Sequence, residues 1–134
     1  MKAKSFLTSF ILITIITMTM GTIASAQDTN RKFRIARIEI HPEFLEAYKL
    51  ALAEHAKAAV QVEPGVLALQ AVYDKAHPTQ VTVFEVYASE DAYQSHLKAA
   101  HFLKYKTGTT KMVKSLELVE VAPIAMEIKA ELLK

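Results

Sequence analysis

The stretch that decides the fold is residues 80–88, which read Gln-Val-Thr-Val-Phe-Glu-Val-Tyr-Ala. Its density of β-branched and aromatic residues predicts a strand. Successive side chains of a strand point to opposite faces of its sheet. One face therefore carries Val81, Val83, Glu85 and Tyr87, and the other carries Thr82, Phe84, Val86 and Ala88. Both sets are substantially apolar, which indicates that both faces of the sheet are covered.

The segments on either side of this strand give a β-α-β-β-α-β order. Apolar and β-branched content predicts further strands over Lys32–Ile40, Val66–Tyr73 and Ser115–Val121. Helical spacing and an N-cap at Ser89 predict helices over Glu43–Gln61 and Glu90–Tyr105, the second with a break near Ala99-Ala100. This order predicts an α+β, ferredoxin-like fold, in which a four-stranded antiparallel sheet carries both helices on one face.

The second face of this sheet needs a cover of its own. The strand over Val66–Tyr73 is apolar on both sides, as is the strand over residues 80–88. Two helices on one side leave the other side exposed, whereas a water-facing antiparallel sheet normally alternates apolar and polar residues. A face-to-face homodimer with an isologous interface is the economical expectation. A bound ligand is the alternative cover.

The N-terminus has the pattern of a secretory signal peptide. Lys2 and Lys4 precede an uncharged, mostly apolar run that ends in Ala24-Ser25-Ala26, a small-x-small cleavage pattern. We expect residues 1–26 to be removed, residues 27–32 to form a polar lead-in, and the product to be periplasmic or secreted without a membrane anchor. The run is close to the lower limit of about 18 residues for a membrane span. An uncleaved anchor is therefore the alternative.

Composition excludes several classes of function. Without Lys2 and Lys4, the 16 basic residues fall to 14, which balances the 14 acidic ones. A chain with no net charge and no basic patch is not expected to bind nucleic acid. The absence of cysteine excludes a disulfide framework, a thiolate zinc site and a cysteine nucleophile.

The last residues, 122–134, are expected to form a tail with a short amphipathic helix over Ile124–Lys134.

Four segments carry a resemblance to a known family. They are Ile35-Ala36-Arg37-Ile38-Glu39-Ile40, Glu63-Pro64-Gly65-Val66-Leu67, Val83-Phe84-Glu85-Val86-Tyr87 and His96-Leu97-x-x-x-His101-Phe102. Over residues 33–121 the chain resembles the antibiotic biosynthesis monooxygenase family, the dimeric α+β barrel group that includes small quinol monooxygenases. It departs from the family where Ala99-Ala100 replace a common Ser-Pro. It also departs where many members carry a Trp after the Glu of this strand, since here Tyr87 stands two residues beyond Glu85.

The resemblance implies a cofactor-free oxygenase that oxidises quinol or phenol-type aromatic substrates with molecular oxygen. Such an enzyme needs an apolar pocket, a base that forms the substrate phenolate, and donors that stabilise the anion. The catalytic candidates are His55, His96 and His101, with Glu85 as the group that orients a histidine. The substrate-binding candidates are the aromatic residues Tyr73, Tyr87, Tyr93, Phe84 and Phe102.

Each candidate also has a purely structural interpretation. A histidine such as His55 is often a core residue bonded to a neighbour. Glu85 either pairs with a base such as Arg37 or points into a cavity, and most of the aromatic residues could simply fill the core. His96 and His101 would lie roughly 140° apart on one regular helix, so they are a poor pair of metal ligands unless the helix breaks between them. No His-Glu-x-x-His motif is present, and we expect no metal.

Two non-enzymatic alternatives share the predicted fold. One is an exported dimer that binds a small aromatic or lipid-like molecule without converting it. The other is a purely structural dimer, which predicts a filled cavity. The first alternative predicts the same apolar pocket as the oxygenase and differs from it only in whether a histidine is placed to accept a proton.

Overall fold

A computed structural model describes residues 30–133, so the expected signal peptide over residues 1–26 lies outside the described part of the chain. The order of elements is β1 (Lys32–Ile40), α1 (Leu45–Val62), β2 (Val66–Tyr73), β3 (Gln80–Tyr87), α2 (Glu90–His96), α3 (Ala100–Thr109) and β4 (Val113–Val121). Short 3-10 turns occupy Pro42–Phe44, Thr110–Met112 and Ala130–Leu133. None of the helices within residues 30–133 is long and apolar enough to cross a membrane.

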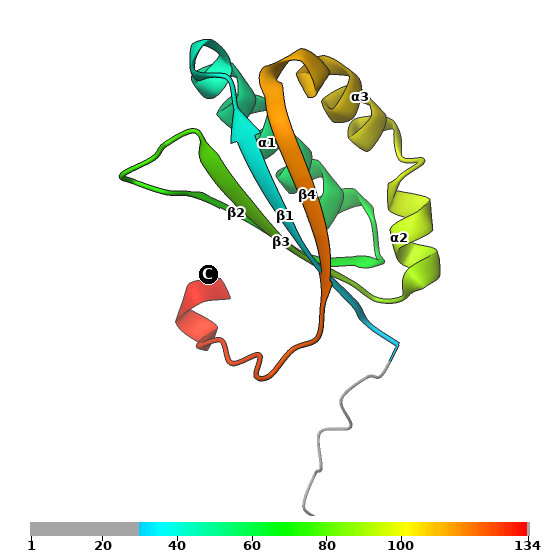
Figure 1. Cartoon of the computed structure of the whole chain (residues 1–134). Coiled ribbons are helices and arrows are strands. Elements are labelled where there is room, and N and C mark those ends of the chain that lie inside the picture. The colour runs from blue at the N-terminus through cyan, green and yellow to red at the C-terminus, as the bar shows by residue number, and fades with distance from the viewer. Residues whose placement is uncertain (1–29, 134) are drawn as a thin grey trace, which may run out of the picture.

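The four strands form one antiparallel sheet in the order β2-β3-β1-β4. Helices α1 and α3 cover one face of this sheet, and α2 lies beyond one end of α3 (Figure 1). In the register of β1 with β3, Arg34 lies opposite Glu85 and Ala36 lies opposite Val83. The architecture confirms the ferredoxin-like α+β prediction.

The main core lies between α1 and the covered face of the sheet. Tyr48 and Leu52 on α1 are buried against Ile38 of β1 and Val83 of β3. The two α1 residues are four positions apart, which places them on the same side of the helix. This packing fixes the position of His55, one turn further along α1, which is also buried.

The second predicted helix is broken between His96 and Ala100, which confirms the expected break. Ala99 has an extended backbone, with φ −65° and ψ 139°. The amide of Ala99 donates to the carbonyl of His96 over 3.0 Å, which closes α2 before α3 begins. Because α3 starts in a new direction, His101 is not held at the angle to His96 that one continuous helix would impose.

The face of the sheet turned away from the helices carries apolar side chains as well. The rings of Phe33 and Phe84 stack there with centroids 6.4 Å apart, and Ile35 and Val119 are half-buried. Val72 on β2 is 64% exposed. This face is therefore apolar and incompletely covered by the part of the chain that the structure describes.

The C-terminal tail is less regular than expected. Of the helix predicted over Ile124–Lys134, the described residues form only the 3-10 turn Ala130–Leu133. The side chain of Ile124 is fully exposed, and that of Leu132 is largely exposed. An amphipathic helix gains most of its stability from packing its apolar face, and these side chains pack little against the described residues.

Candidate active site

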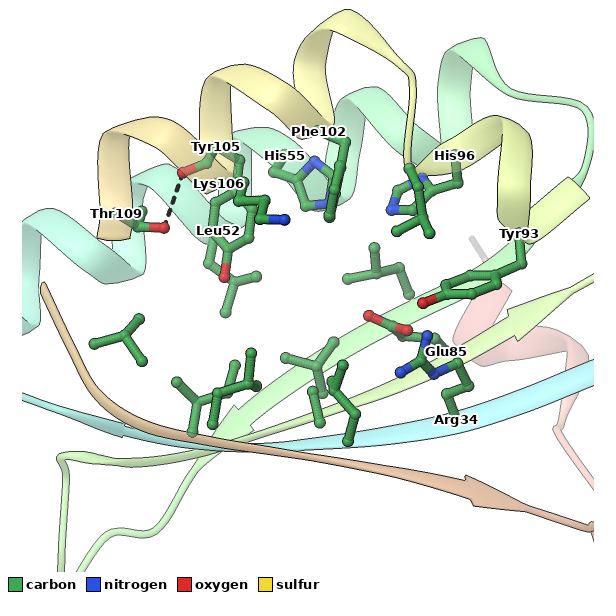
Figure 2. Close-up of a pocket in the computed structure, with 18 of the residues that line it drawn as sticks. Arg34, Leu52, His55, Glu85, Tyr93, His96, Phe102, Tyr105, Lys106 and Thr109 are labelled. Atoms are coloured by element: carbon green, nitrogen blue, oxygen red, sulfur yellow. Dashed lines mark hydrogen bonds between the residues drawn. The ribbon is translucent and has the colours of Figure 1, made fainter. Parts of the chain in front are cut away.

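A cavity of about 480 Å³ lies between the helices and the covered face of the sheet. Its wall is mostly apolar, with contributions from residues such as Leu52, Val83 and Leu118. Figure 2 shows His55, His96 and Phe102 along the helical wall, with Arg34 and Glu85 across from them on the sheet. A volume of this size suits a small organic ligand. An apolar wall with a few convergent polar groups is typical of a ligand site.

A short polar contact at this cavity joins His96 to Glu63. The Nδ1 atom of His96 lies 2.8 Å from Oε1 of Glu63. His96 is only 1% exposed, and its ring lines the cavity. A carboxylate at Nδ1 fixes the orientation and tautomer of an imidazole, as in the dyads of acyl-transfer enzymes. The N–H group at Nδ1 then donates to Glu63, and Nε2 carries the free lone pair of the ring.

The local sequence explains why Glu63 reaches His96. Glu63 is the C-cap of α1, with extended backbone at φ −99° and ψ 112°. Pro64 and Gly65 follow and turn the chain into β2. The carbonyl of Gly65 accepts from the amide of Ala88 over 2.9 Å, which ties this turn to the start of the α2 region. Ser89 then caps α2 by accepting from the amide of Ala92.

His101 contacts the same oxygen of this carboxylate. Its Nε2 atom lies 2.7 Å from Oε1 of Glu63, and its Nδ1 lies 3.2 Å from Nδ1 of His55. His101 does not line the main cavity. It lines a smaller cavity of about 190 Å³ on the other side of His55.

His55 is a weak base in this environment. Burial, together with the proximity of His96 and His101, lowers the pKa of His55 from 6.5 to about 4. Its ring stacks on Tyr105 with centroids 4.6 Å apart. The side chain lines both cavities, but it is neutral and a poor proton acceptor at pH 7.

Glu85 contacts neither a histidine nor Arg37. It points into the cavity beside Arg34 (Figure 2), and it accepts from the hydroxyl of Tyr87 over 3.2 Å. Burial raises the pKa of the Glu85 carboxyl above its usual value, against the opposing effect of Arg34. Arg37 lies on the opposite face of the sheet and pairs with Glu117. The expectation that Glu85 orients a histidine is therefore wrong, because Glu63 holds that position.

Two tyrosines form the far end of the cavity. The hydroxyl groups of Tyr48 and Tyr105 lie 2.6 Å apart, and both residues line the cavity. Burial raises the pKa of both hydroxyl groups. They therefore remain protonated at neutral pH and hold a hydrogen bond between α1 and α3.

The cavity brings together only some of the predicted substrate-binding residues. Tyr87, Tyr93 and Phe102 line it, whereas Tyr73 and Phe84 do not. Tyr73 lies under the ammonium group of Lys49, 4.1 Å from its ring centre, and is half exposed. Phe84 and Glu85 are adjacent along β3, so the side chain of Phe84 points to the face of the sheet opposite to that of Glu85. Placing Phe84 and Glu85 in one pocket was inconsistent with the period of a strand.

Sequence reasoning missed Glu63 and Arg34 as site residues. In the sequence Glu63 is part of the turn Glu63-Pro64-Gly65, which does not indicate where its side chain points. Arg34 is three residues before Arg37 on β1 and therefore on the other face. Its burial and its register position opposite Glu85 place its guanidinium in the cavity. It also lies over the ring of Tyr93, 4.4 Å from the ring centre.

Comparison with known proteins shows which family the chain resembles. The sequence profile described as "Antibiotic biosynthesis monooxygenase" matches residues 33–108. The chain belongs to the antibiotic biosynthesis monooxygenase family. The matched part of this family member includes every residue of the histidine and carboxylate site, from Arg34 to Tyr105. No curated protein matches the chain.

Solved structures agree with this assignment. A candidate antibiotic biosynthesis monooxygenase from Bacteroides thetaiotaomicron is 45% identical, with a TM-score of 0.73 over 76% of this chain and 97% of that one. A candidate monooxygenase from Lactobacillus acidophilus is 28% identical, with a TM-score of 0.69 over 72% of this chain and 46% of that one. A protein from Nitrosomonas europaea is 18% identical, with a TM-score of 0.67 over 71% and 91%, and supports the fold alone.

Proposed function

We propose that this family member is a cofactor-independent monooxygenase that oxidises a quinol or phenol-type aromatic substrate with molecular oxygen. The observation that carries the proposal is the His96–Glu63 pair at the wall of a mostly apolar cavity. Family membership supports the reaction class, and the pair supplies the base that the reaction needs.

In the proposed mechanism, His96 removes the proton from a substrate hydroxyl. Nδ1 of His96 donates to Glu63, so Nε2 is the nitrogen that accepts the substrate proton. The carboxylate stabilises the imidazolium that forms, in the same way that a buried aspartate supports a catalytic histidine. His55 is the less suitable base, since its lowered pKa of about 4 weakens its hold on a proton.

The sheet side of the cavity supplies the groups that hold the phenolate. Arg34 is buried and lies beside Glu85, and burial raises the pKa of the Glu85 carboxyl against the opposing effect of Arg34. A guanidinium group in a low-dielectric site stabilises a nearby anion more strongly than it would in water. Tyr93 and Phe102 provide flat surfaces for an aromatic ring.

The electrons come from the substrate. A phenolate is electron-rich enough to reduce oxygen directly, and the apolar wall protects the reactive intermediates from water. In the oxidation of a hydroquinone to a hydroxyquinone, one oxygen atom enters the ring and the other leaves as water. The substrate supplies all the electrons, so no flavin or nicotinamide is needed.

Oxygen uptake by the purified protein tests this proposal. The protein is treated with a chelator and given a panel of reduced quinols and anthrone-like phenols. We expect uptake above the spontaneous rate, and His96→Gln should lower kcat by about 100-fold or more, as general-base catalysis contributes 10²–10⁴. His55→Gln should lower it less, and His77→Gln, at a side chain 75% exposed and far from the cavity, should not.

Two results would contradict the proposal. A folded protein that takes up no oxygen with any member of the panel, but binds these compounds in a calorimeter, would be the non-enzymatic binding protein. Uptake that is unaffected by His96→Gln, in a variant with the parent melting temperature, would remove His96 from the mechanism.

We also propose that the protein acts as a homodimer and is exported. The apolar face formed by residues such as Phe84, Val72 and Val119 is incompletely covered by residues 30–133. A second copy of this face would bury it in an isologous interface. The export proposal rests on the signal-peptide pattern of residues 1–26.

A further inference from the structure

We propose that Glu63, His96 and His101 bind a divalent transition-metal ion such as Zn²⁺, and that the bound ion switches His96 off as a base. The binding site stands on the geometry of these three residues. Only the consequence for turnover rests on the proposed function.

The three residues offer a complete set of donor atoms. One ligand atom from each lies within 4.8 Å of the others. Two imidazole nitrogens and one carboxylate oxygen are the ligands of many three-residue zinc sites, which leave a fourth position open. Bonds of about 2.0–2.1 Å in a tetrahedral site place the donors roughly 3.4 Å apart. The present separations of 2.7 and 2.8 Å need to widen by less than about 1 Å.

The break in the helix creates this site. On one continuous helix, His96 and His101 would point in directions roughly 140° apart. The chain instead ends α2 at His96 and restarts at Ala100, so both rings reach the carboxylate of Glu63. The two histidines are a poor pair of metal ligands only on a regular helix, and the break between α2 and α3 removes that obstacle.

The Nε2 atom of His101 gives a second, independent indication. It is buried and has no hydrogen-bond partner among residues 30–133, although Oε1 of Glu63 is only 2.7 Å away. The proton or lone pair of Nε2 points outward in the plane of the ring. This direction therefore misses the Glu63 oxygen. An ion beside the oxygen can meet both atoms, because a metal requires the lone pairs to converge on a common point and not on each other.

The surroundings of His101 fit those of a metal ligand. Its other nitrogen, Nδ1, lies 3.2 Å from Nδ1 of His55. Metal-binding histidines usually use their second nitrogen in a hydrogen bond that fixes the ring. The side chains of His101 and Glu63 are 18% and 14% exposed, so an ion can enter from solvent.

Metal binding changes which nitrogen of His96 carries the proton. Without metal, Nδ1 carries the proton that is donated to Glu63, and Nε2 is the base. A metal on Nδ1 uses the lone pair of that nitrogen, so the neutral ring carries its proton on Nε2. The His96 ring at the cavity wall then carries an N–H donor at Nε2. It cannot accept a substrate proton, because no lone pair is free.

Metal binding is measured first without reference to turnover. Purified, chelator-stripped protein is titrated with Zn²⁺ by calorimetry and with Co²⁺ by visible absorption. We expect one ion per chain and a cobalt spectrum of low coordination number. Glu63→Gln and His101→Gln should each weaken affinity by more than about tenfold. Glu54→Gln is the matched control, as Glu54 is exposed and pairs only with Lys104 among the described residues.

The tautomer switch has its own readout. Nitrogen chemical shifts of the His96 ring distinguish a proton on Nδ1 from one on Nε2, and they should exchange when Zn²⁺ is added. In the oxygen-uptake assay, Zn²⁺ should inhibit the parent protein and the Glu54→Gln variant to the same extent.

The outcomes separate the two proposals. If Zn²⁺ shows no saturable binding, or binds equally to the parent, Glu63→Gln and His101→Gln proteins, the metal site is refuted. Binding without a change in the His96 nitrogen shifts refutes the switch. Saturable binding with exchanged nitrogen shifts, in a protein that consumes no oxygen with or without metal, supports the site and refutes only the oxygenase.

Discussion

Replacing Gly65 by alanine is expected to push α2 away from the turn that carries Glu63. A Cβ atom at position 65 would lie 2.5 Å from Cβ of Ala92 and 3.4 Å from its Cα. Non-bonded carbons prefer separations of about 3.5–4.0 Å, so the two methyl groups must separate by about 1 Å or more. Ala92 has no flexible side chain that could move aside, so the helix itself must shift.

The expected loss of stability follows from this overlap. Overpacking of a well-packed site costs about 1–3 kcal/mol. For a domain of about this size, 1 kcal/mol changes Tm by roughly 4–8 °C. We therefore expect Gly65→Ala to lower Tm by roughly 5–20 °C in a calorimetric scan. Because α2 carries His96, the Glu63–His96 contact should lengthen, and oxygen uptake should fall as well.

Two further variants make this reasoning refutable. Gly108→Ala places a methyl group where no atom lies within 4 Å, in the exposed helix α3, so it should raise stability by up to about 1 kcal/mol. Ala92→Gly in the Gly65→Ala background removes the clash, so the second change should recover stability in this background although it lowers stability alone. An unchanged Tm for Gly65→Ala, or additive effects of the two changes, would refute the clash.

Three other predictions address titration, the tyrosine pair and the dimer. In chelated buffer, the lowered pKa of His55 means that the unfolded chain binds more protons between pH 6.5 and about 4. The folding stability that is present above pH 6.5 is therefore lost as the pH falls toward 4. In urea titrations, His55→Gln should flatten this decline. An unchanged decline would contradict the prediction. Tyr48→Phe removes the hydroxyl that contacts the hydroxyl of Tyr105 and should lower the unfolding free energy by about 1–2 kcal/mol, whereas an unchanged urea midpoint would mean that the 2.6 Å contact contributes nothing. Val72→Lys introduces a charge at a side chain that is 64% exposed on the face proposed for the dimer. The variant should sediment as a monomer and keep the circular dichroism spectrum of the parent. Persistent dimers would place the interface elsewhere.

The fold could be predicted from the sequence because each strand and helix has a local signal. The alternation along residues 80–88 is visible in the chain, and so are the N-cap at Ser89 and the turn at Pro64-Gly65. These features act over a few residues. The tail over residues 122–133 lacked this support, since helical spacing there is not accompanied by a surface on which to pack.

The site was harder to predict because its contacts join distant residues. His96 and Glu63 are 33 positions apart, and His101 and His55 are 46 apart. The sequence indicated which histidines lie near the sheet, but it did not indicate which carboxylate each would meet. Glu85 interrupts an apolar strand, which makes it conspicuous in the sequence. Its partner there is set by the strand register, which places Arg34 opposite it.

The break between α2 and α3 has a consequence for how the site depends on the rest of the protein. The break contains neither glycine nor proline: Leu97, Lys98, Ala99 and Ala100 are all good helix formers. Local preference therefore favours one continuous helix, and the tertiary structure overrules it, a case of local frustration. A peptide cut from this region should join the two helices and separate the histidines. The convergence of both rings on one carboxylate is thus a property of the assembled fold that none of its fragments possesses.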